Sequence, residues 1–312
     1  MRSFLRARIF ALGPLLAATL WGGMYVVSKW GFESVPPVTL AFLRVFVGAL
    51  TLLVAVRILY PQREFSRSDW YGFGVLGIWV AVTLTTQFVG TDLTTASEGA
   101  LLTVLTPIFT LGFGIVVLDE LLTRRKVTGM TVALGGTVVV LASRHSLTNL
   151  GAGSMLGIAM LVLASVGWAV YTVWGKPLVQ RYSALETAAY STALSVPMLG
   201  VLVPVEFGLT AATPATIVLT LPIVAAVFYL GVLSTAVAWY CWYKGVEYVE
   251  TGTVAVYFFA QPAVAAALGA IFLGESLGPG FFTGGVVMAI GIYLVSTSEK
   301  QATDPETTPS AE

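Results

Sequence analysis

Long apolar stretches separated by short polar ones recur along the whole chain. Each holds about 18 to 25 residues, and a helix of that length, rising about 1.5 Å per residue, crosses a hydrocarbon layer of roughly 30 Å. The pattern predicts an all-α membrane protein with ten transmembrane helices. The expected helices cover residues 9–31, 37–60, 70–91, 95–118, 124–143, 153–175, 185–205, 219–243, 251–273 and 278–298.

The second half of the chain repeats positions of the first at fixed spacings. The matched pairs are Pro107 and Pro262, Glu120 and Glu275, Gly129 and Gly284, and Gly136 and Gly291 at a spacing of 155, and Trp21 and Trp168, and Lys29 and Lys176 at 147. Five helices per half is an odd number, so the halves insert in opposite orientations, a plan typical of alternating-access transporters. We expect two inverted repeats, 9–143 and 153–298, joined by an outer loop at 144–152 around a central cavity.

Composition agrees with this pattern. Of the 312 residues, 57% are hydrophobic and 10% are charged, and the mean hydropathy is +0.87. These values lie outside the range of ordinary soluble domains. The formal net charge is zero, which gives no reason to expect a nucleic-acid partner. The expected surroundings are a lipid bilayer, and the oligomeric state is left open.

Basic residues are unevenly divided between the two sides of the expected bundle. Thirteen of the sixteen Lys and Arg residues share the side of the N-terminus, whereas Lys29 and Arg144 lie on the other side and Arg44 lies within a span. Such an excess marks the cytoplasmic side. We therefore expect residues 1–8 and a disordered polar tail at 299–312 in the cytoplasm, with the helices in a plasma membrane, the inner one of a bacterium.

Aromatic and polar residues in the first and sixth helices mark a candidate cavity. Trp21, Tyr25 and Lys29 recur at four-residue intervals, on one face of a helix. Trp168 and Thr172 repeat the spacing in the second half. Inward-facing aromatic side chains can give a cavity an apolar surface together with hydrogen-bond donors. The alternative is an aromatic belt at the membrane surface.

The eighth and ninth helices add three candidates for the same cavity. Trp239 lies one turn before Trp242 in a segment that is aromatic on more than one face, so part of it must face lipid or other helices. Tyr257 and Gln261 lie one turn apart on the ninth helix and continue one face.

Pro107 and Pro262 lie within the fourth and ninth helices. A proline inside a helix removes one backbone hydrogen bond, frees a carbonyl and introduces a kink. A membrane tolerates this where neighbours or a cavity satisfy the freed group. The two kinks are therefore candidate gates, with a static bend of the bundle as the alternative.

Arg44 and Glu98 are the charged residues expected inside the hydrocarbon region. A charge there costs about 2.5 to 3.5 kcal/mol at the centre on insertion scales and so needs a physical reason. The two lie near the same outer depth and could form an ion pair. Alternatively, Arg44 receives a substrate carboxylate, or Glu98 exchanges a proton with the outer solution.

Glu120 and Glu275 lie where a helix ends and a loop begins. An acidic side chain just before a helix can accept hydrogen bonds from its first amide groups and complement its dipole, so both are expected to be structural caps. His145 and Cys241 are the only histidine and cysteine, and they are distant in sequence, so no metal or cofactor is expected.

The sequence resembles the drug/metabolite transporter superfamily, and in particular its EamA-type members. The resemblance rests on the "LTPIFT" and "FAQPAVAAAL" helices, each followed by an acidic residue in "LDE" and "LGE", and on "LAFLRV" in the second helix. It covers about residues 9–298. It implies two inverted five-helix halves around a central cavity and the export of small metabolites such as amino acids.

Transport is therefore the leading functional prediction, with an amino acid or similar metabolite as substrate. No P-loop sequence GxxxxGK[ST] occurs, so the sequence gives no sign of ATP hydrolysis, and any energy coupling would use an ion gradient. The nearest alternative is efflux of apolar drugs or other xenobiotics. A membrane-embedded lipid-modifying enzyme is disfavoured, because the ionisable groups within the spans are few and scattered. A simple pore is not distinguished by sequence.

Overall fold

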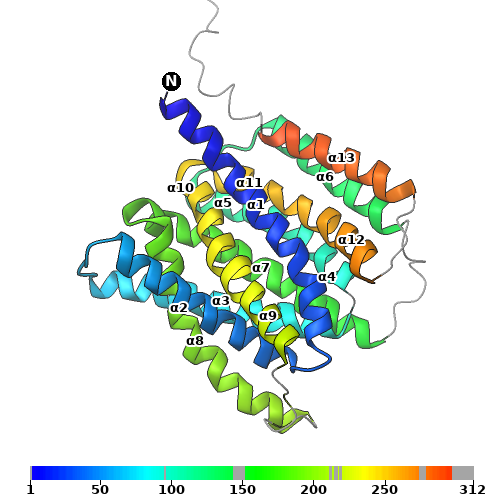
Figure 1. The fold of residues 1–312 in the computed structure, drawn as a ribbon. Helices are drawn as coiled ribbons and strands as arrows, with labels where there is room; N and C mark the ends of the chain where they lie inside the picture. Colours follow the sequence, from blue (N-terminus) through cyan, green and yellow to red (C-terminus); the bar gives the residue numbers. More distant parts are fainter. Residues whose placement is uncertain are drawn as a thin grey trace, which may run out of the picture.

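The computed structural model describes residues 2–94, 96–142, 152–210, 213, 217, 220–273 and 279–296, and these residues form a helical bundle without strands (Figure 1). Residues 144–151 of the expected outer loop and the expected tail at 299–312 lie outside this part. The elements are α1 (Arg2–Gly31), α2 (Pro37–Leu59), α3 (Arg67–Asp92), α4 (Ala96–Leu102), η1 (Thr103–Leu105), α5 (Thr106–Leu118), α6 (Arg124–Ala142), α7 (Ala152–Arg181), α8 (Ala184–Leu209), α9 (Leu221–Phe228), η3 (Tyr229–Val237), α10 (Ala238–Tyr248), α11 (Thr251–Ala255), η4 (Val256–Phe259), α12 (Ala260–Leu273) and α13 (Pro279–Ser296).

All ten expected spans are helical over the residues that are described, apart from the end residues Tyr60 and Thr220, and three of the spans are composite. The fourth, eighth and ninth spans consist of α4-η1-α5, α9-η3-α10 and α11-η4-α12. The sixth span is longer than expected, since α7 continues past residue 175 to Arg181. The Arg181 guanidinium pairs with the Asp69 carboxylate near the start of α3 at 3.1 Å, which holds this last turn against the bundle.

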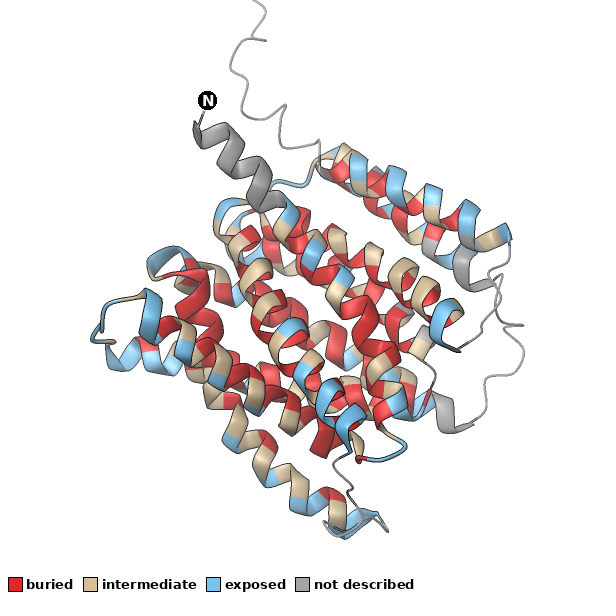
Figure 2. Ribbon diagram, viewed as in Figure 1, coloured by how far each residue is buried: buried red, intermediate tan, exposed pale blue. Residues whose placement is uncertain are grey.

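The bundle has the properties of a membrane protein. Six described segments are long and apolar enough to span a bilayer: Pro37–Leu59, Arg67–Asp92, Met155–Arg181, Ala184–Leu209, Leu221–Tyr248 and Thr251–Phe272. Large apolar side chains such as Val116, Val201 and Ile271 are exposed on the outside. Figure 2 shows the buried residues gathered on the inner sides of the helices. An apolar exterior of this kind suits contact with lipid.

A tight 3₁₀ turn interrupts the fourth and ninth spans at matched places. The turns are η1 and η4, and each directly precedes the helix that carries Pro107 or Pro262. Both prolines therefore lie in the first turn of a new α-helix, where the missing N–H is not needed. This corrects the expectation of a proline in the middle of a continuous helix: the 3₁₀ turn makes the break, and the proline begins the helix after it.

The eighth span contains a wider π-helical segment, η3, between α9 and α10. It packs closely on α2, because an added Cβ at Gly48 would meet Thr235 and one at Gly231 would meet Val47. Segments of π-helix replace the usual hydrogen-bond spacing by one of five residues and are frequent at functional sites. In η3 the carbonyl of Ser234 is bound by two side chains from other helices.

Helices α6 and α13 pack side by side at one edge of the bundle (Figure 1). An added Cβ at Gly136 would lie 2.6 Å from the carbonyl oxygen of Gly284, and one at Gly291 would lie 2.6 Å from that of Gly129. Gly129 is the repeat counterpart of Gly284, and Gly136 that of Gly291. The contacts are thus reciprocal between counterparts, which is the pattern of an isologous, two-fold related pair.

Candidate functional site

A small cavity lies where helices from both halves of the chain meet. Its volume is about 20 Å³, roughly the room for one water molecule. Four pairs of its lining residues occupy counterpart positions in the repeats: Trp21 and Trp168, Leu84 and Trp239, Thr103 and Phe258, and Thr106 and Gln261. The two repeats therefore contribute matching positions to the cavity, but the side chains at these positions differ. In three of the four pairs the larger side chain, Trp239, Phe258 or Gln261, comes from the second half.

Aromatic side chains close the centre of this cavity. The ring centroids of the counterparts Trp21 and Trp168 are 5.0 Å apart, in an edge-to-face arrangement. Trp21 also stacks on Phe258 at 5.4 Å, and Trp168 contacts Trp239 at 5.4 Å. The Trp21 Nε1 donates to the Ser234 carbonyl at 2.9 Å. A substrate larger than water can enter only if these rings separate.

Arg44 reaches the cavity from α2 and is almost completely buried, with 1% exposure. Its Nε donates to Thr235 Oγ1 at 2.7 Å, and its Nη2 donates to the Ser234 carbonyl at 3.1 Å. Its Nη1 points to the sulfur of Met24, and the guanidinium lies 5.6 Å from the ring centre of Phe88. All these partners are neutral, and within the described part of the chain no carboxylate lies at ion-pair distance from Arg44.

Several polar atoms at the cavity are buried and have no hydrogen-bond partner among the described residues. They are the indole N–H groups of Trp168 and Trp239, the amide nitrogen of Gln261, and the hydroxyls of Thr83 and Thr106. A buried donor without a partner costs about 1 to 3 kcal/mol. Unpaired groups concentrated around one cavity are therefore candidates for binding a ligand.

Tyr25 and Thr172 lie behind the cavity wall instead of lining it. The Tyr25 hydroxyl accepts from Gln87 Nε2 at 2.7 Å and donates to Thr103 Oγ1 at 3.2 Å, and both of these partners line the cavity. Thr172 Oγ1 accepts from Trp242 Nε1 at 3.1 Å. Both candidates thus hold other residues in position.

Tyr257 is not among the lining residues, and Phe258 takes its place. The expectation assumed α-helical spacing from Tyr257 to Gln261. Because η4 is a 3₁₀ turn with about three residues per turn, Phe258 and Gln261 share a face instead. The same shift in η1 brings Thr103 and Thr106 to the cavity. In the sequence, the matched prolines that follow these turns were the feature that could have indicated the change in helical spacing.

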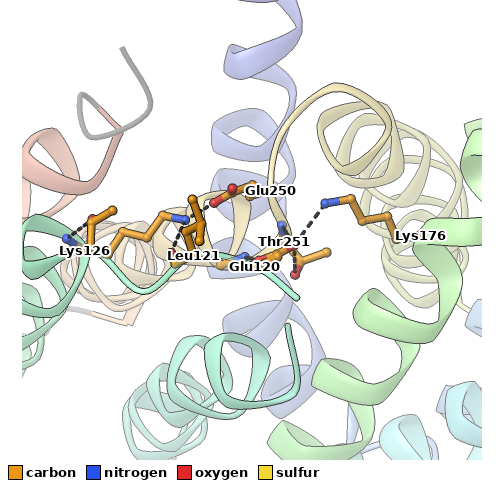
Figure 3. Close-up of polar contacts among 8 residues, drawn as sticks. Glu120, Leu121, Lys126, Lys176, Glu250 and Thr251 are labelled. Atoms are coloured by element: carbon orange, nitrogen blue, oxygen red, sulfur yellow. Dashed lines mark hydrogen bonds and ion pairs between the residues drawn. The ribbon is translucent and has the colours of Figure 1, made fainter. Parts of the chain in front are cut away.

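Glu120 does cap a helix, but in the other half of the chain. Its Oε1 accepts from the Thr251 backbone N–H at 2.8 Å, and its Oε2 accepts from the Gly252 N–H at 3.2 Å, so it caps the start of α11 and not the following α6 (Figure 3). Lys176 Nζ of α7 lies 2.9 Å from the same carboxylate. Asp119, with φ of 53°, ends α5 in the left-handed conformation and turns the chain there.

The charge on Glu120 is stabilised by these contacts. Burial raises the pKa of Glu120, but the Lys176 ammonium and the bonds from Thr251 outweigh it and leave the pKa below its ordinary value. A second ion pair joins Lys126, at the start of α6, to Glu250, directly before α11 (Figure 3). We call the part of the bundle that holds these two pairs the Glu120 end.

At the opposite end, Lys29 binds backbone instead of a carboxylate in the described residues. Its Nζ donates to the carbonyl oxygens of Asp92 at 2.8 Å, Thr94 at 2.9 Å and Thr91 at 3.3 Å. A cation at these carbonyls complements the dipole at the end of α3. The side chain of Glu98 and all of Glu275 lie outside the described residues, so their expected roles as charge partner and cap remain predictions.

Comparison with known proteins decides the family. The sequence model of the EamA-like transporter family matches residues 8–142 and 155–297. The chain belongs to this family. It is accordingly a multi-pass membrane transporter of the drug/metabolite transporter superfamily, and the family indicates transport of a small molecule rather than catalysis.

EamA-family relatives match the chain almost end to end. An uncharacterized transporter from Archaeoglobus fulgidus is 28% identical, over 92% of this chain and 98% of its own length. A probable terminal-alkyne amino-acid exporter from Streptantibioticus cattleyicolor is 25% identical, over 90% of this chain and 91% of its own. A probable amino-acid metabolite efflux pump from Salmonella typhimurium is 25% identical, over 90% and 92%.

A solved crystal structure shares the fold. It superimposes with a TM-score of 0.77 over 95% of this chain and 99% of its own length, at 19% sequence identity. At this identity the likeness concerns the fold alone. It agrees with the ten-helix architecture described above.

Proposed function

We propose that this EamA-family protein is a secondary transporter of the plasma membrane that exports amino acids or related small metabolites by alternating access. Two relatives carry names that refer to amino-acid export or efflux. The observation that carries the proposal is the central cavity, which combines aromatic surface with unpaired hydrogen-bond donors. The apolar side chain of an amino acid can pack on the aromatic surface, and its carboxylate can accept hydrogen bonds from the unpaired donors.

Alternating access would use two inverted repeats, residues 9–143 and 153–298, that move relative to each other around this cavity. The thirteen-to-two distribution of basic residues supports placing the Glu120 end and both termini in the cytoplasm. In the conformation described here the cavity is closed around about 20 Å³. Transport would therefore alternate between widening of the cavity toward the Glu120 end and toward the Lys29 end.

The test is counterflow in proteoliposomes preloaded with single unlabelled amino acids and supplied with the labelled form. We expect saturable counterflow for at least one amino acid. Trp168→Ala should abolish it without loss of insertion, because it removes a large cavity surface, whereas Trp174→Ala on the exposed face of α7 should not. Absence of counterflow with every amino acid would refute amino-acid export.

The second candidate is efflux of apolar drugs, which the aromatic lining of Trp21, Trp168, Trp239 and Phe258 favours. Arg44 disfavours it for cationic drugs, since two like charges repel strongly at low dielectric. Transport of uncharged amphipathic dyes, with no counterflow of amino acids, would favour this candidate.

A further inference from the structure

We infer that the cavity recognises its substrate through a carboxylate held by Arg44, and that the substrate's amino group is not required for binding. The inference rests on the proposed transport function and specifies the chemistry of the same cavity. It predicts that anions and zwitterions with an apolar body bind, and that the corresponding amines do not.

Arg44 has no anionic partner among the described residues. A guanidinium has five N–H donors, and in this conformation those of Arg44 bond to a hydroxyl, a carbonyl and a thioether sulfur. None of these carries a negative charge. A buried cation without a counter-charge is expensive, and a carboxylate can accept two parallel charge-assisted hydrogen bonds from a guanidinium. A bound carboxylate would supply the missing charge.

Three other donors point to the same chemistry independently of Arg44. The N–H groups of Trp168, Trp239 and Gln261 lack partners among the described residues, and these residues are 7%, 1% and 1% exposed. All three line the same cavity as Arg44 and can donate but not accept through these atoms. A ligand that satisfies them must present acceptors, as the two oxygens of a carboxylate do.

The substrate's amino group finds no anionic partner among the described residues of the cavity. None of the described lining residues is Asp or Glu, so this part of the lining offers an ammonium group no carboxylate. An amine would also enter beside the Arg44 cation without any compensating anion. In a zwitterion the carboxylate offsets that repulsion, and the indole faces can accept the ammonium by cation–π contact. The amino group is thus tolerated but not needed.

The experiment compares matched probes on the purified, unaltered protein in lipid nanodiscs by calorimetric titration. One set is L-leucine, 4-methylpentanoate, which lacks the amino group, and 3-methylbutylamine, which lacks the carboxylate. The second set is L-phenylalanine, 3-phenylpropionate and 2-phenylethylamine. We expect the carboxylate of at least one set to bind within about tenfold of its amino acid, and neither amine to bind. Binding, and not flux, is measured because the free acids cross lipid unaided.

Two variants then test the residues. Arg44→Gln should weaken carboxylate binding about 10- to 100-fold, as expected for loss of a charged hydrogen-bond partner, whereas Arg57→Gln at the exposed end of the same helix should leave it unchanged. If Arg44→Gln does not fold, the probe comparison on the unaltered protein still decides. Amine binding equal to acid binding, failure of both acids to bind, or carboxylate binding insensitive to Arg44→Gln would each overturn the inference.

These failures can be told apart from failure of the proposed function. Amino-acid counterflow together with amine binding would leave amino-acid export standing and refute carboxylate recognition. Carboxylate binding without any amino-acid counterflow would leave carboxylate recognition standing and refute amino-acid export.

Discussion

Large aromatic side chains close the centre of the bundle, and the indole rings of the tryptophans among them carry a polar N–H group at one edge. Trp239 and Trp242 are the largest fully buried side chains in the described part of the chain. The indole N–H of Trp239 has no partner there, although the rest of the ring is packed against Trp168 and Tyr171. Its aromatic surface and its N–H group therefore serve separable purposes. The surface stabilises the closed cavity, and the N–H is available to a ligand.

Replacing Trp239 by Phe keeps most of the aromatic surface and removes the N–H. We expect substrate affinity to fall about 10- to 100-fold, because a hydrogen bond to a charged group contributes about 1.5 to 3 kcal/mol. Thermal stability without substrate should not fall by the same amount, since no protein bond is lost. Trp174→Phe on the exposed face of α7 is the control for both measurements. Unchanged affinity of the Trp239 variant would show that its N–H does not contact substrate.

At the scale of elements, the halves of the chain are joined by close helix packing and by charged contacts at helix ends. Glycine allows α6 and α13 to approach backbone to backbone, as small residues do between membrane helices. Glu120 joins the end of α5 to the start of α11 and to α7. The first joint is apolar and rigid, whereas the second depends on charge.

Gly136 and Gly135 give a matched test of the α6–α13 joint. An added Cβ at Gly136 would lie 2.6 Å from the backbone of α13, and one at Gly135 would have nothing within 4 Å. We expect Gly136→Ala to lower the unfolding temperature, because backbone atoms cannot yield without separating the helices. Gly135→Ala should leave it unchanged or raise it, since alanine favours a helix over glycine by about 1 kcal/mol. Equal effects would refute the close packing.

Breaking the Glu120 contacts should open the bundle at that end. Glu120→Gln leaves Lys176 without its counter-charge and weakens the cap on α11. The reporter is a cysteine that replaces cavity residue Ala164 in a protein that also carries Cys241→Ser. In the Glu120 variant it should react about several-fold faster with an impermeant maleimide added from the cytoplasmic side than it does when Glu120 is present. Glu247→Gln breaks a pair within the single helix α10 and should have no such effect. An unchanged rate in the Glu120 variant would show that these contacts do not hold the end closed.

The same reporter should be insensitive to pH near neutrality. The folded-state pKa of Glu120 is below its ordinary value, so its ion pair stabilises the closed end above the unfolded pKa and is lost only as pH falls through the folded one. An ordinary glutamate titrates near pH 4.3. The labelling rate, corrected for thiol reactivity with an exposed cysteine at Leu122, should therefore stay constant from about pH 8 to pH 5. A change within that interval would point to another titrating group.

At the scale of the whole molecule, the two halves meet as counterparts. Trp21 contacts Trp168, and the glycine contacts of α6 and α13 are reciprocal between repeat positions. Both observations fit a two-fold axis that crosses the bundle near the cavity. Motion of one half against the other would then exchange the environments of the two ends.

Inverted insertion makes a direct topological prediction. In a Cys241→Ser background, a cysteine at Leu122, next to Glu120, should react with impermeant reagent only from the cytoplasm. A cysteine at Ser276, next to Glu275, should react only from outside. Labelling of whole cells and of inside-out vesicles measures both. Reaction of the two positions from the same side would refute the inverted arrangement of the repeats.

The sequence by itself determined the ten helices, their boundaries to within a few residues at most ends, the family and the chemistry available to the centre. Apolar length sets a membrane span without reference to other helices. Four of the seven residues expected in the cavity, Trp21, Trp168, Trp239 and Gln261, line it because their helices do turn that face inward.

Only the tertiary structure decided which turns face the cavity and which groups meet across the halves. Ideal helical spacing favoured Tyr257, but the 3₁₀ turn η4 rotates Phe258 inward. Glu120 was expected to cap the helix after it, yet it caps α11, 131 residues away along the chain. Spacing along one helix fixes which residues share a face, whereas the rotation of that helix and its distant partners are set by the packing of the whole bundle.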